Sequence, residues 1–486
     1  MMTRKPGASI SRRDFIEGLS GAVPVAAMAT LLPAGSVAAK SESLAGNAHI
    51  HLPHFAPRAK RAIQLFMSGA PSQMDLWDYK PGLVRMYDQD LPDSVRGNQA
   101  LTSMTAGQTR FPIAPPYWKF AQYGQSGRHV SDLLPWTAKV VDELALVHTL
   151  NTDAINHEPA QLLMNTGNMV PGKASLGAWL SYGLGRMNEN LPAFVVLNSK
   201  LLPHTNNQPI SPKFWGSGFL SSEHAGVAFR SAGTPVLNLK DPAGIPRSGR
   251  RAFLDCVNAV NQETYERWRD PETLARISQY ELAFRMQRSV PELTDLSKEP
   301  DSTWKLYGEE ARKSGTFANN CLLARRMAER GVRFTQIYQR GWDVHGGAVK
   351  AQPILCAATD RACYALIIDL RRRGLLDDTL VIWNGEFGRT VYSQGGLSRT
   401  EYGRDHHPRC FTGWMAGGGS RAGSAYGQTD DFSYNVVKDP VHVRDFTATV
   451  LHLLGIDHNR MIFKSQGLDQ KPTGVVPAKV VASLLA

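Results

Sequence analysis

Runs of apolar and β-branched residues recur along the chain, separated by polar and glycine-rich stretches. They cover Arg61 to Gly69, Leu144 to Asn151, Ala193 to Ser199, Val332 to Arg340, Thr379 to Gly388 and Phe411 to Gly419. Most of them are nearly continuous in apolar residues, which is typical of parallel strands that are buried on both faces. The pattern predicts a buried and mostly parallel sheet.

Between some of these runs, apolar residues repeat at helical spacing instead. One such stripe extends from Ala358 to Leu370 and stops at Gly374, and another extends from Val443 to Leu453 and stops at Gly455. A glycine directly after the last apolar position is a common helix end. The alternation predicts an α/β protein in which helices cover both faces of one central sheet.

The middle of the chain has a different pattern. Residues 249–328 are charged and helical in spacing, as in ETYERWRDPETLARISQYELAFRMQR, and we interpret them as a helical insertion into a domain of residues 40–486. Proline- and glycine-rich stretches near residues 92–116 and 200–248 are predicted to be long loops, which are often functional.

Residues 1–39 are predicted to be a targeting signal rather than part of the core. SRRDFIE (Ser11 to Glu17) precedes a weakly apolar stretch, and Val37-Ala38-Ala39 offers a small-residue cleavage site. This order resembles a twin-arginine export signal. It predicts a periplasmic or secreted protein that folds, with any metal inserted, before export. No later segment is long and apolar enough to predict a membrane span.

Charge and cysteine content narrow the class of partner. The formal net charge is +11, which favours an anionic partner such as a nucleic acid or an anionic glycan. Because there is no lysine-rich run and no RNA-binding motif, a nucleic acid is the weaker interpretation, and sulfated or phosphorylated substrates fit better. The five cysteines form no C-x-x-C pair, which excludes a zinc knuckle and a disulfide framework.

Compact polar motifs lie at the boundaries of the predicted strands. Ligands of parallel α/β sheets bind outside the carboxyl ends of the strands, so we expect these motifs to share one site. The candidates are Ser68, Asp75, Asp153, His157, Asp343, His345, Glu386, Arg389, Asp405, His406 and His407. A mixture of histidines and carboxylates predicts a divalent metal ion, with zinc, manganese, magnesium and calcium all open.

Each motif taken alone also has a simpler interpretation. Asp343 and Asp75 would suit turn or helix caps, and His157 would suit a helix start with its ring hydrogen-bonded. Glu386 would suit a solvated turn, with Arg389 as its ion-pair partner. Because proline follows the His406-His407 pair, one ring pointing inward and one outward is also expected.

Several segments resemble alkaline-phosphatase-like and sulfatase enzymes. GLLDDTLVIWNGEFG resembles the helix, strand and acidic metal ligand of that superfamily, with Glu386 at the ligand position and Phe387 where a second ligand would stand. GWDVHGG resembles its Asp/His metal motif, and GRDHHPRCFTGWMAGGG with VHVRDFTATVLHLLGID resembles its C-terminal part.

HEPAQLLMNTG lies on the sulfatase pattern C-x-P-S-R-x-x-L-L-T-G but departs from it at the reactive positions. Pro159, Thr166 and Gly167 match in register, whereas His157 stands at the nucleophile position. Ala160 and Gln161 replace the usual serine and arginine.

Taken whole, the chain is identified as a member of the exported family of unknown function 1501. The stretches that carry this resemblance are FMSGAPSQMDLWDYKPGL, DAINHEPAQLLMNTG, NGEFGRT and GRDHHPRCF. The resemblance implies an alkaline-phosphatase-like α/β fold and an exported, metal-dependent hydrolase of phosphate or sulfate esters. Sulfated polysaccharide is one candidate substrate. The competing class is a catalytically degenerate glycan-binding or scaffold protein of the same fold.

The superfamily forms a covalent intermediate on Ser, Thr or a modified Cys, so the histidine leaves three interpretations open. In the first, His157 binds a metal and a hydroxide held by that metal attacks the ester. In the second, His157 itself attacks phosphorus. In the third, the site binds an anion or glycan without turnover. We favour the first.

The candidate residues divide by their predicted roles. Arg389 would hold the anion, and Ser68 is a fallback nucleophile. His157 would face the reacting group. The predicted metal ligands are Asp343, His345, Glu386, His406 and His407, with Asp75 and Asp405 as lesser candidates.

Overall fold

The computed structural model describes residues 53–486 apart from residues 204, 207, 231–233, 237–238, 240 and 242–243. The predicted signal of residues 1–39 lies outside the described residues. The chain divides into two compact units, one of residues 1–48 and 240–277 and the other of residues 49–239 and 278–486. The larger unit contains the sheet and every candidate site residue.

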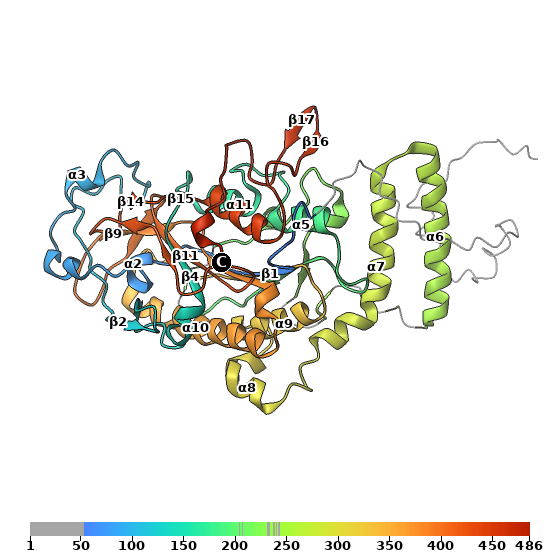
Figure 1. The fold of residues 1–486 in the computed structure, drawn as a ribbon, viewed down its shortest axis with the longest axis horizontal. Coiled ribbons are helices and arrows are strands. Elements are labelled where there is room, and N and C mark those ends of the chain that lie inside the picture. The colour runs from blue at the N-terminus through green and yellow to red at the C-terminus, as the bar shows by residue number, and fades with distance from the viewer. Residues whose placement is uncertain are drawn as a thin grey trace, which may run out of the picture. The chain divides into compact units, whose positions relative to one another are not determined.

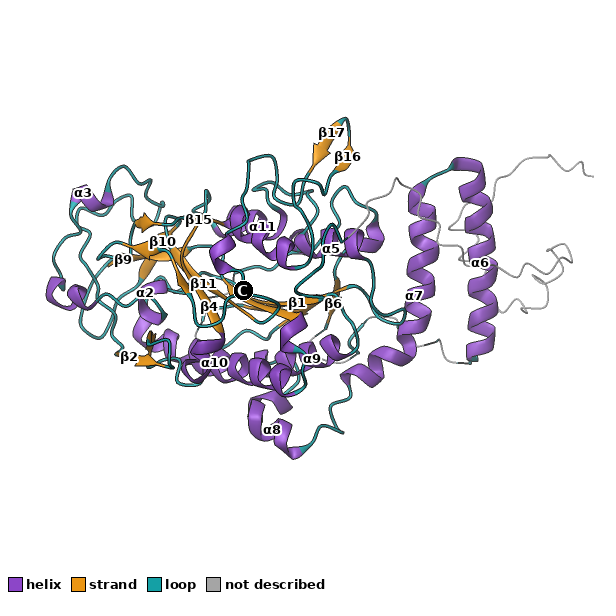
Figure 2. Ribbon diagram, viewed as in Figure 1, coloured by secondary structure: helices purple, strands orange, loops and turns teal. Residues whose placement is uncertain are grey.

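Within the described part, nine strands form one sheet (Figures 1 and 2). Their order is β12 (Ala425–Tyr426), β4 (Leu144–Asn151), β11 (Phe411–Ala416), β8 (Thr379–Asn384), β1 (Arg61–Met67), β7 (Phe334–Gln339), β5 (Phe194–Asn198) and β6 (Val227–Phe229), with β15 (Val441–His442) also paired to β4. Neighbouring strands are parallel except at β11. The predicted mostly parallel α/β fold is confirmed.

Strand β11 differs from its neighbours because it is antiparallel to both β4 and β8. After β8, the chain forms the antiparallel pair β9 (Gly388–Ser393) and β10 (Arg404–His407) and then enters β11 without a crossover helix. A parallel connection needs such a crossover, so the returning strand is antiparallel. Composition alone carried no information about this direction.

Helices cover both faces of the sheet. Along β1, Ile63, Leu65 and Met67 pack in one apolar cluster with α9 (Phe317–Glu329) and α10 (Ala348–Arg372). Ala62 and Phe66 pack in a second cluster with α4 (His157–Thr166), α5 (Leu176–Leu184) and α11 (Val443–Leu453). Successive strand residues point to opposite faces, so a fully apolar strand supplies both clusters.

The charged middle segment is helical. It contains α6 (Arg247–Trp268), α7 (Pro271–Thr294), α8 (Asp301–Tyr307) and α9. The smaller unit contains α6 and the start of α7, whereas α8 and α9 belong to the larger unit. The α9 side chains Phe317, Cys321 and Leu322 are buried in the sheet core.

The remaining elements are short. They are α2 (Gln73–Leu76), α3 (Asp93–Arg96), β2 (Phe120–Tyr123), β3 (Arg128–Ser131), β13 (Gln428–Thr429), β14 (Val436–Lys438), β16 (Phe463–Ser465) and β17 (Leu468–Gln470). All five cysteines are free thiols. Among the described residues, no helix combines the length and apolar character that crossing a bilayer requires.

Candidate metal centre

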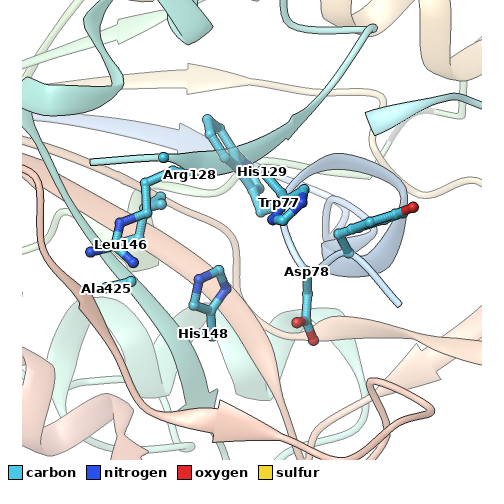
Figure 3. Close-up of a pocket in the computed structure, with 9 residues that line it drawn as sticks. Trp77, Asp78, Arg128, His129, Leu146, His148 and Ala425 are labelled. Atoms are coloured by element: carbon cyan, nitrogen blue, oxygen red, sulfur yellow. The ribbon is translucent and has the colours of Figure 1, made fainter. Parts of the chain in front are cut away.

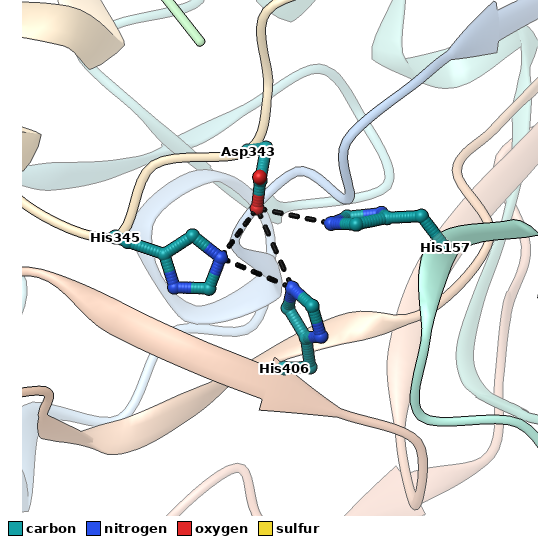
Figure 4. Close-up of side chains that lie close together, drawn as sticks. All are labelled: His157, Asp343, His345 and His406. Carbon is teal, nitrogen blue, oxygen red and sulfur yellow. Dashed lines mark hydrogen bonds and ion pairs between the residues drawn. The ribbon is translucent and has the colours of Figure 1, made fainter. Parts of the chain in front are cut away.

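Two strand-to-helix junctions and one short strand bring four side chains together at the sheet edge. His157 is the first residue of α4, which follows β4. Asp343 and His345 lie between β7 and α10, and His406 lies on β10. One donor atom from each of these residues lies within 4.8 Å of the others (Figure 4). We call His157, Asp343, His345 and His406 the donor cluster.

The three imidazoles all turn the same nitrogen toward one carboxylate oxygen. Nε2 of His157, His345 and His406 lies 3.0, 2.7 and 3.4 Å from Oδ1 of Asp343. Nε2 of His345 is also 3.1 Å from Nε2 of His406. The side chains are 4–17% exposed, with His345 the most accessible, so solvent reaches the cluster from its side.

The other ring nitrogen of each histidine is bonded to an oxygen. Nδ1 of His157 lies 2.6 Å from Oε1 of Glu386, Nδ1 of His345 lies 2.6 Å from Oε1 of Gln394, and Nδ1 of His406 lies 2.7 Å from the Ile155 carbonyl. Each of these oxygens accepts, so Nδ1 carries the proton and Nε2 of a neutral ring carries a lone pair.

This arrangement fits a bound cation. Lone pairs on three imidazoles and a carboxylate oxygen repel one another unless a positive charge lies between them. Nε2 of His157 is buried and makes no hydrogen bond within the described residues. Histidine ligands of metals characteristically donate their second N–H to a carboxylate, carbonyl or similar acceptor, as all three rings do here.

The pKa directions reflect the same crowding. Burial opposes charge on His157, but the nearby carboxylates of Asp343 and Glu386 prevail and raise its pKa above the ordinary value. Burial lowers the pKa of His406 to about 4 in spite of Asp343. Burial opposes charge on Asp343, yet the three histidines and Arg389 hold its pKa far below the usual range. Asp343 is therefore an anion that attracts either a proton or a metal.

Asp343 is held in place by its neighbours. Nη2 of Arg389 donates to Oδ1 at 2.6 Å, and Nε2 of Gln208 donates to Oδ2 at 2.6 Å. Nδ2 of Asn206 donates to the Asp343 carbonyl at 2.6 Å. A carboxylate fixed at this many points is preorganised to bind a cation.

A family model described as "Protein of unknown function (DUF1501)" matches residues 59–485. The chain belongs to the DUF1501 family. The match confirms the family predicted from the sequence. No curated protein matches the chain.

Solved structures similar to this DUF1501 protein include the PsFucS1 sulfatase from Pseudoalteromonas sp.. The sequence identity is 12% and the TM-score is 0.33, and the match covers 82% of this chain and 68% of the sulfatase chain. A protein in the alkaline phosphatase superfamily from Vibrio parahaemolyticus has 9% identity, coverage of 84% and 70%, and a TM-score of 0.33. The lipoteichoic acid synthase LtaP from Listeria monocytogenes has 10% identity, coverage of 87% and 76%, and a TM-score of 0.32.

Glu386 lies behind His157 rather than among the four donors. Its Oε1 accepts from His157 and from the Gly69 backbone N–H at 2.9 Å, with Gln161 Nε2 at 3.3 Å. Its other oxygen, Oε2, is buried without a hydrogen-bond partner in the described chain. In the DUF1501 protein, this carboxylate orients the His157 ring.

Arg389 lies behind Asp343. The side chain is buried, and besides Asp343 it donates to the carbonyls of Ala70 and Arg404 at 3.0 and 3.1 Å and to the carbonyl of Gly69. The guanidinium therefore joins the loop after β1 to the donor cluster.

His407 and Asp75 lie apart from the donor cluster. Nε2 of His407 lies 2.6 Å from the Tyr434 carbonyl, and burial lowers the pKa of His407 to about 3. His406 and His407 are successive residues of β10, so their rings point to opposite sides. Asp75 forms a buried ion pair with Arg404, with N–O distances of 2.8 and 2.9 Å.

The remaining candidates also have partners of their own. Asp405 accepts from the hydroxyls of Thr102 and Thr105, both at 2.5 Å. Ser68 is fully buried, and its Oγ accepts from Gln161 Nε2 at 3.2 Å. Asp153 pairs with Arg444 Nη1 at 2.6 Å.

Sequence analysis did not identify Gln394 and Gln208, the amides that orient His345 and Asp343. Both lie in loops, and no spacing or residue pattern distinguishes them from ordinary surface glutamines. The stretch near residues 200–248 is predicted to be a long loop, and long loops are often functional, which is the available signal for Gln208.

Proposed function

We propose that this protein is a metal-dependent hydrolase of phosphate or sulfate esters, with one metal ion held by His157, Asp343, His345 and His406. The convergence of three imidazole Nε2 atoms on one buried carboxylate oxygen carries the proposal. The proposal makes His157 a ligand, with Glu386 as its orienting partner.

The donor set favours zinc or manganese over magnesium and calcium. Three imidazole nitrogens and one carboxylate oxygen suit a borderline transition metal, whereas magnesium and calcium prefer sites made of oxygen. Phe387 supports a single ion, because its buried ring packs against His157 and His406 at 4.9 and 4.6 Å where the superfamily pattern has a further ligand.

The place of the centre in the fold supports an anionic substrate. It lies at the carboxyl edge of parallel strands, where α/β enzymes bind ligands, and beside the N-terminus of α4, which favours negative charge. A bound divalent ion would act as a Lewis acid toward an ester oxygen. The net charge of +11 also favours an anionic ester or sulfated glycan over a cationic ligand.

The contacts of His157 favour a ligand over a nucleophile. Nδ1 is occupied by Glu386, and Nε2 faces Asp343 inside the donor cluster. A nucleophilic imidazole would need one nitrogen free to reach the ester. Ser68 is also without access, since it is fully buried.

Export by the twin-arginine route to the periplasm or beyond is part of the same proposal. It rests on the paired arginines Arg12 and Arg13, the apolar stretch and the Val37-Ala38-Ala39 site. This route carries folded proteins, which suits a metal acquired in the cytoplasm.

One observation favours a second candidate, a glycan-binding or scaffold protein with a structural metal. Four protein donors complete a tetrahedral coordination sphere, as in structural zinc sites, whereas catalytic zinc keeps a position for water or substrate. The hydrolase therefore requires the metal to accept a fifth ligand.

Hydrolysis assays with metal analysis separate the two candidates. Wild type, His157→Ala, Glu386→Ala and a control, His407→Gln, are purified, checked for folding by circular dichroism, and assayed on aryl phosphates and aryl sulfates. The hydrolase predicts activity that is lost in His157→Ala and Glu386→Ala and kept in His407→Gln. Metal-loaded wild type without activity on any ester, together with glycan binding that survives the first two substitutions, would support the second candidate.

A further inference from the structure

A cavity lies beside the β2–β3 hairpin and strand β4. Its volume is about 180 Å³, and its walls include Trp77, Asp78, Tyr79, Arg128, His129 and His148 (Figure 3). It shares no residue with the donor cluster. Because a water molecule in the liquid takes about 30 Å³, the space suits a small ion or one charged group of a larger ligand.

Hydrogen-bond donors lie in the wall of this cavity or directly behind it. The Trp77 side chain is 3% exposed, and its indole N–H has no acceptor within the described residues. Nε and Nη2 of Arg128 donate to the Gly423 carbonyl at 3.2 and 2.9 Å, which fixes the guanidinium and leaves Nη1 without a partner among the described residues. Nδ1 of His148 has a distant contact, 3.4 Å from the Thr412 hydroxyl.

The acidic group of the cavity wall is already neutralised. Oδ2 of Asp78 accepts from the hydroxyls of Thr429 and Ser433, both at 2.5 Å, and Oδ1 lies 3.2 Å from Nζ of Lys80. Both oxygens of this carboxylate therefore already have partners, and the guanidinium of Arg128 adds positive charge to the wall.

Aromatic packing holds the wall in place. The Tyr79 ring lies 4.8 Å from the His129 ring and 5.0 Å from the Phe120 ring. The hairpin that carries Arg128 and His129 is thereby attached to the segment after α2.

We propose that this cavity binds a sulfate or phosphate group, either as a free ion or as an ester on a larger ligand. An arginine edge, an imidazole and a buried indole N–H together match an oxyanion, which only accepts hydrogen bonds. The proposal does not depend on the metal centre.

Isothermal titration calorimetry of the full protein with sodium sulfate and with sodium phosphate tests the proposal, at ionic strength held constant with chloride. The variants are Trp77→Phe and Arg128→Gln. The control is Trp414→Phe, since Trp414 also has a buried indole N–H without a partner but lies outside the cavity, stacked on Trp383. Melting temperatures verify that each variant folds.

We expect saturable binding of at least one anion at one site per chain. Arg128→Gln should weaken it about tenfold or more and Trp77→Phe severalfold, because each removes hydrogen bonds to a charged group. Trp414→Phe should bind as wild type does. If Arg128→Gln does not fold, the anion affinity of Trp77→Phe tests the proposal.

Two results would overturn the proposal. One is a wild type that binds neither anion. The other is binding that is equally tight in Trp77→Phe, which would place the anion elsewhere, including at the metal centre. A preference for sulfate or for phosphate identifies which ester the cavity accepts.

Discussion

Replacement of Glu386 by glutamine is the most specific test of how the centre is held. The substitution keeps the length of the side chain and leaves an amide oxygen that can accept hydrogen bonds. In the wild type, Oε1 of Glu386 lies 2.6 Å from Nδ1 of His157 and 2.9 Å from the Gly69 backbone nitrogen. It removes the negative charge behind the ring. The fold and the positions of the four donors should persist.

The magnitude follows from the change in the kind of hydrogen bond. A hydrogen bond to a charged group contributes about 1.5–3 kcal/mol and a neutral one about 0.5–1.5 kcal/mol, so Glu386→Gln should weaken metal binding by about 1–1.5 kcal/mol. That corresponds to a roughly tenfold higher dissociation constant, at the lower end of the 10- to 100-fold losses typical of outer-shell partners.

Competition against a chromophoric chelator measures the zinc affinity of wild type and variant. Asp360→Asn is the matched control, because Asp360 is also a buried carboxylate that accepts from two backbone N–H groups, those of Trp136 and Thr137 at 2.8 and 2.7 Å. Equal zinc affinities in wild type and Glu386→Gln would show that the Glu386 charge does not support the metal site. An equal loss in Asp360→Asn would show that the effect is not specific to Glu386.

Three further predictions concern stability and geometry. In metal-free protein the pKa of His157 is raised, so the charged ring stabilises the folded state below about pH 6.5, and this stabilisation is lost as pH rises through the folded-state pKa. Melting temperatures at pH 6 and pH 8.5 should therefore differ more in wild type than in His157→Gln. Equal differences in the two proteins would contradict this prediction. Gly69→Ala should weaken zinc binding more than tenfold, because a Cβ there would overlap the Asp343 backbone nitrogen, whereas Gly172→Ala, also at positive φ but in open space, should bind zinc normally. Glu299→Gln should destabilise the protein by about 1.5–3 kcal/mol in urea unfolding, because it takes the carboxylate partner from buried Arg326 and one of three from Arg325. It should leave zinc affinity unchanged.

Much of the fold could be predicted from the sequence because its strands are buried on both faces. Runs such as Arg61–Met67 are apolar throughout, and this pattern distinguishes them from half-exposed strands. The direction of β11 could not be predicted, because it depends on a short connection through β9 and β10 rather than on the composition of the strand.

Strand ends also brought the candidate residues to the correct edge of the sheet, but not to their individual positions. His157, Asp343, His345 and His406 face one another, whereas Glu386 and Arg389 stand one layer behind. Spacing along the chain gives the edge at which a residue lies, and tertiary contacts decide where its side chain points.

Loop residues are the part of the site that could not be predicted from the sequence. Gln394 determines the tautomer of His345 from a loop after β9, and no periodicity marks it. A hydrogen bond between segments 49 residues apart depends on the path of the chain, which composition does not encode.

X-ray absorption spectroscopy at the metal edge of the purified protein shows whether the donor cluster holds a metal ion. We expect one transition-metal ion per chain with three imidazole ligands and oxygen, at metal–ligand distances of about 2.0–2.2 Å for zinc, and loss of the ion in His406→Ala but not in His407→Gln. A protein without metal after growth with zinc and manganese, or a spectrum without imidazole scattering, would contradict it.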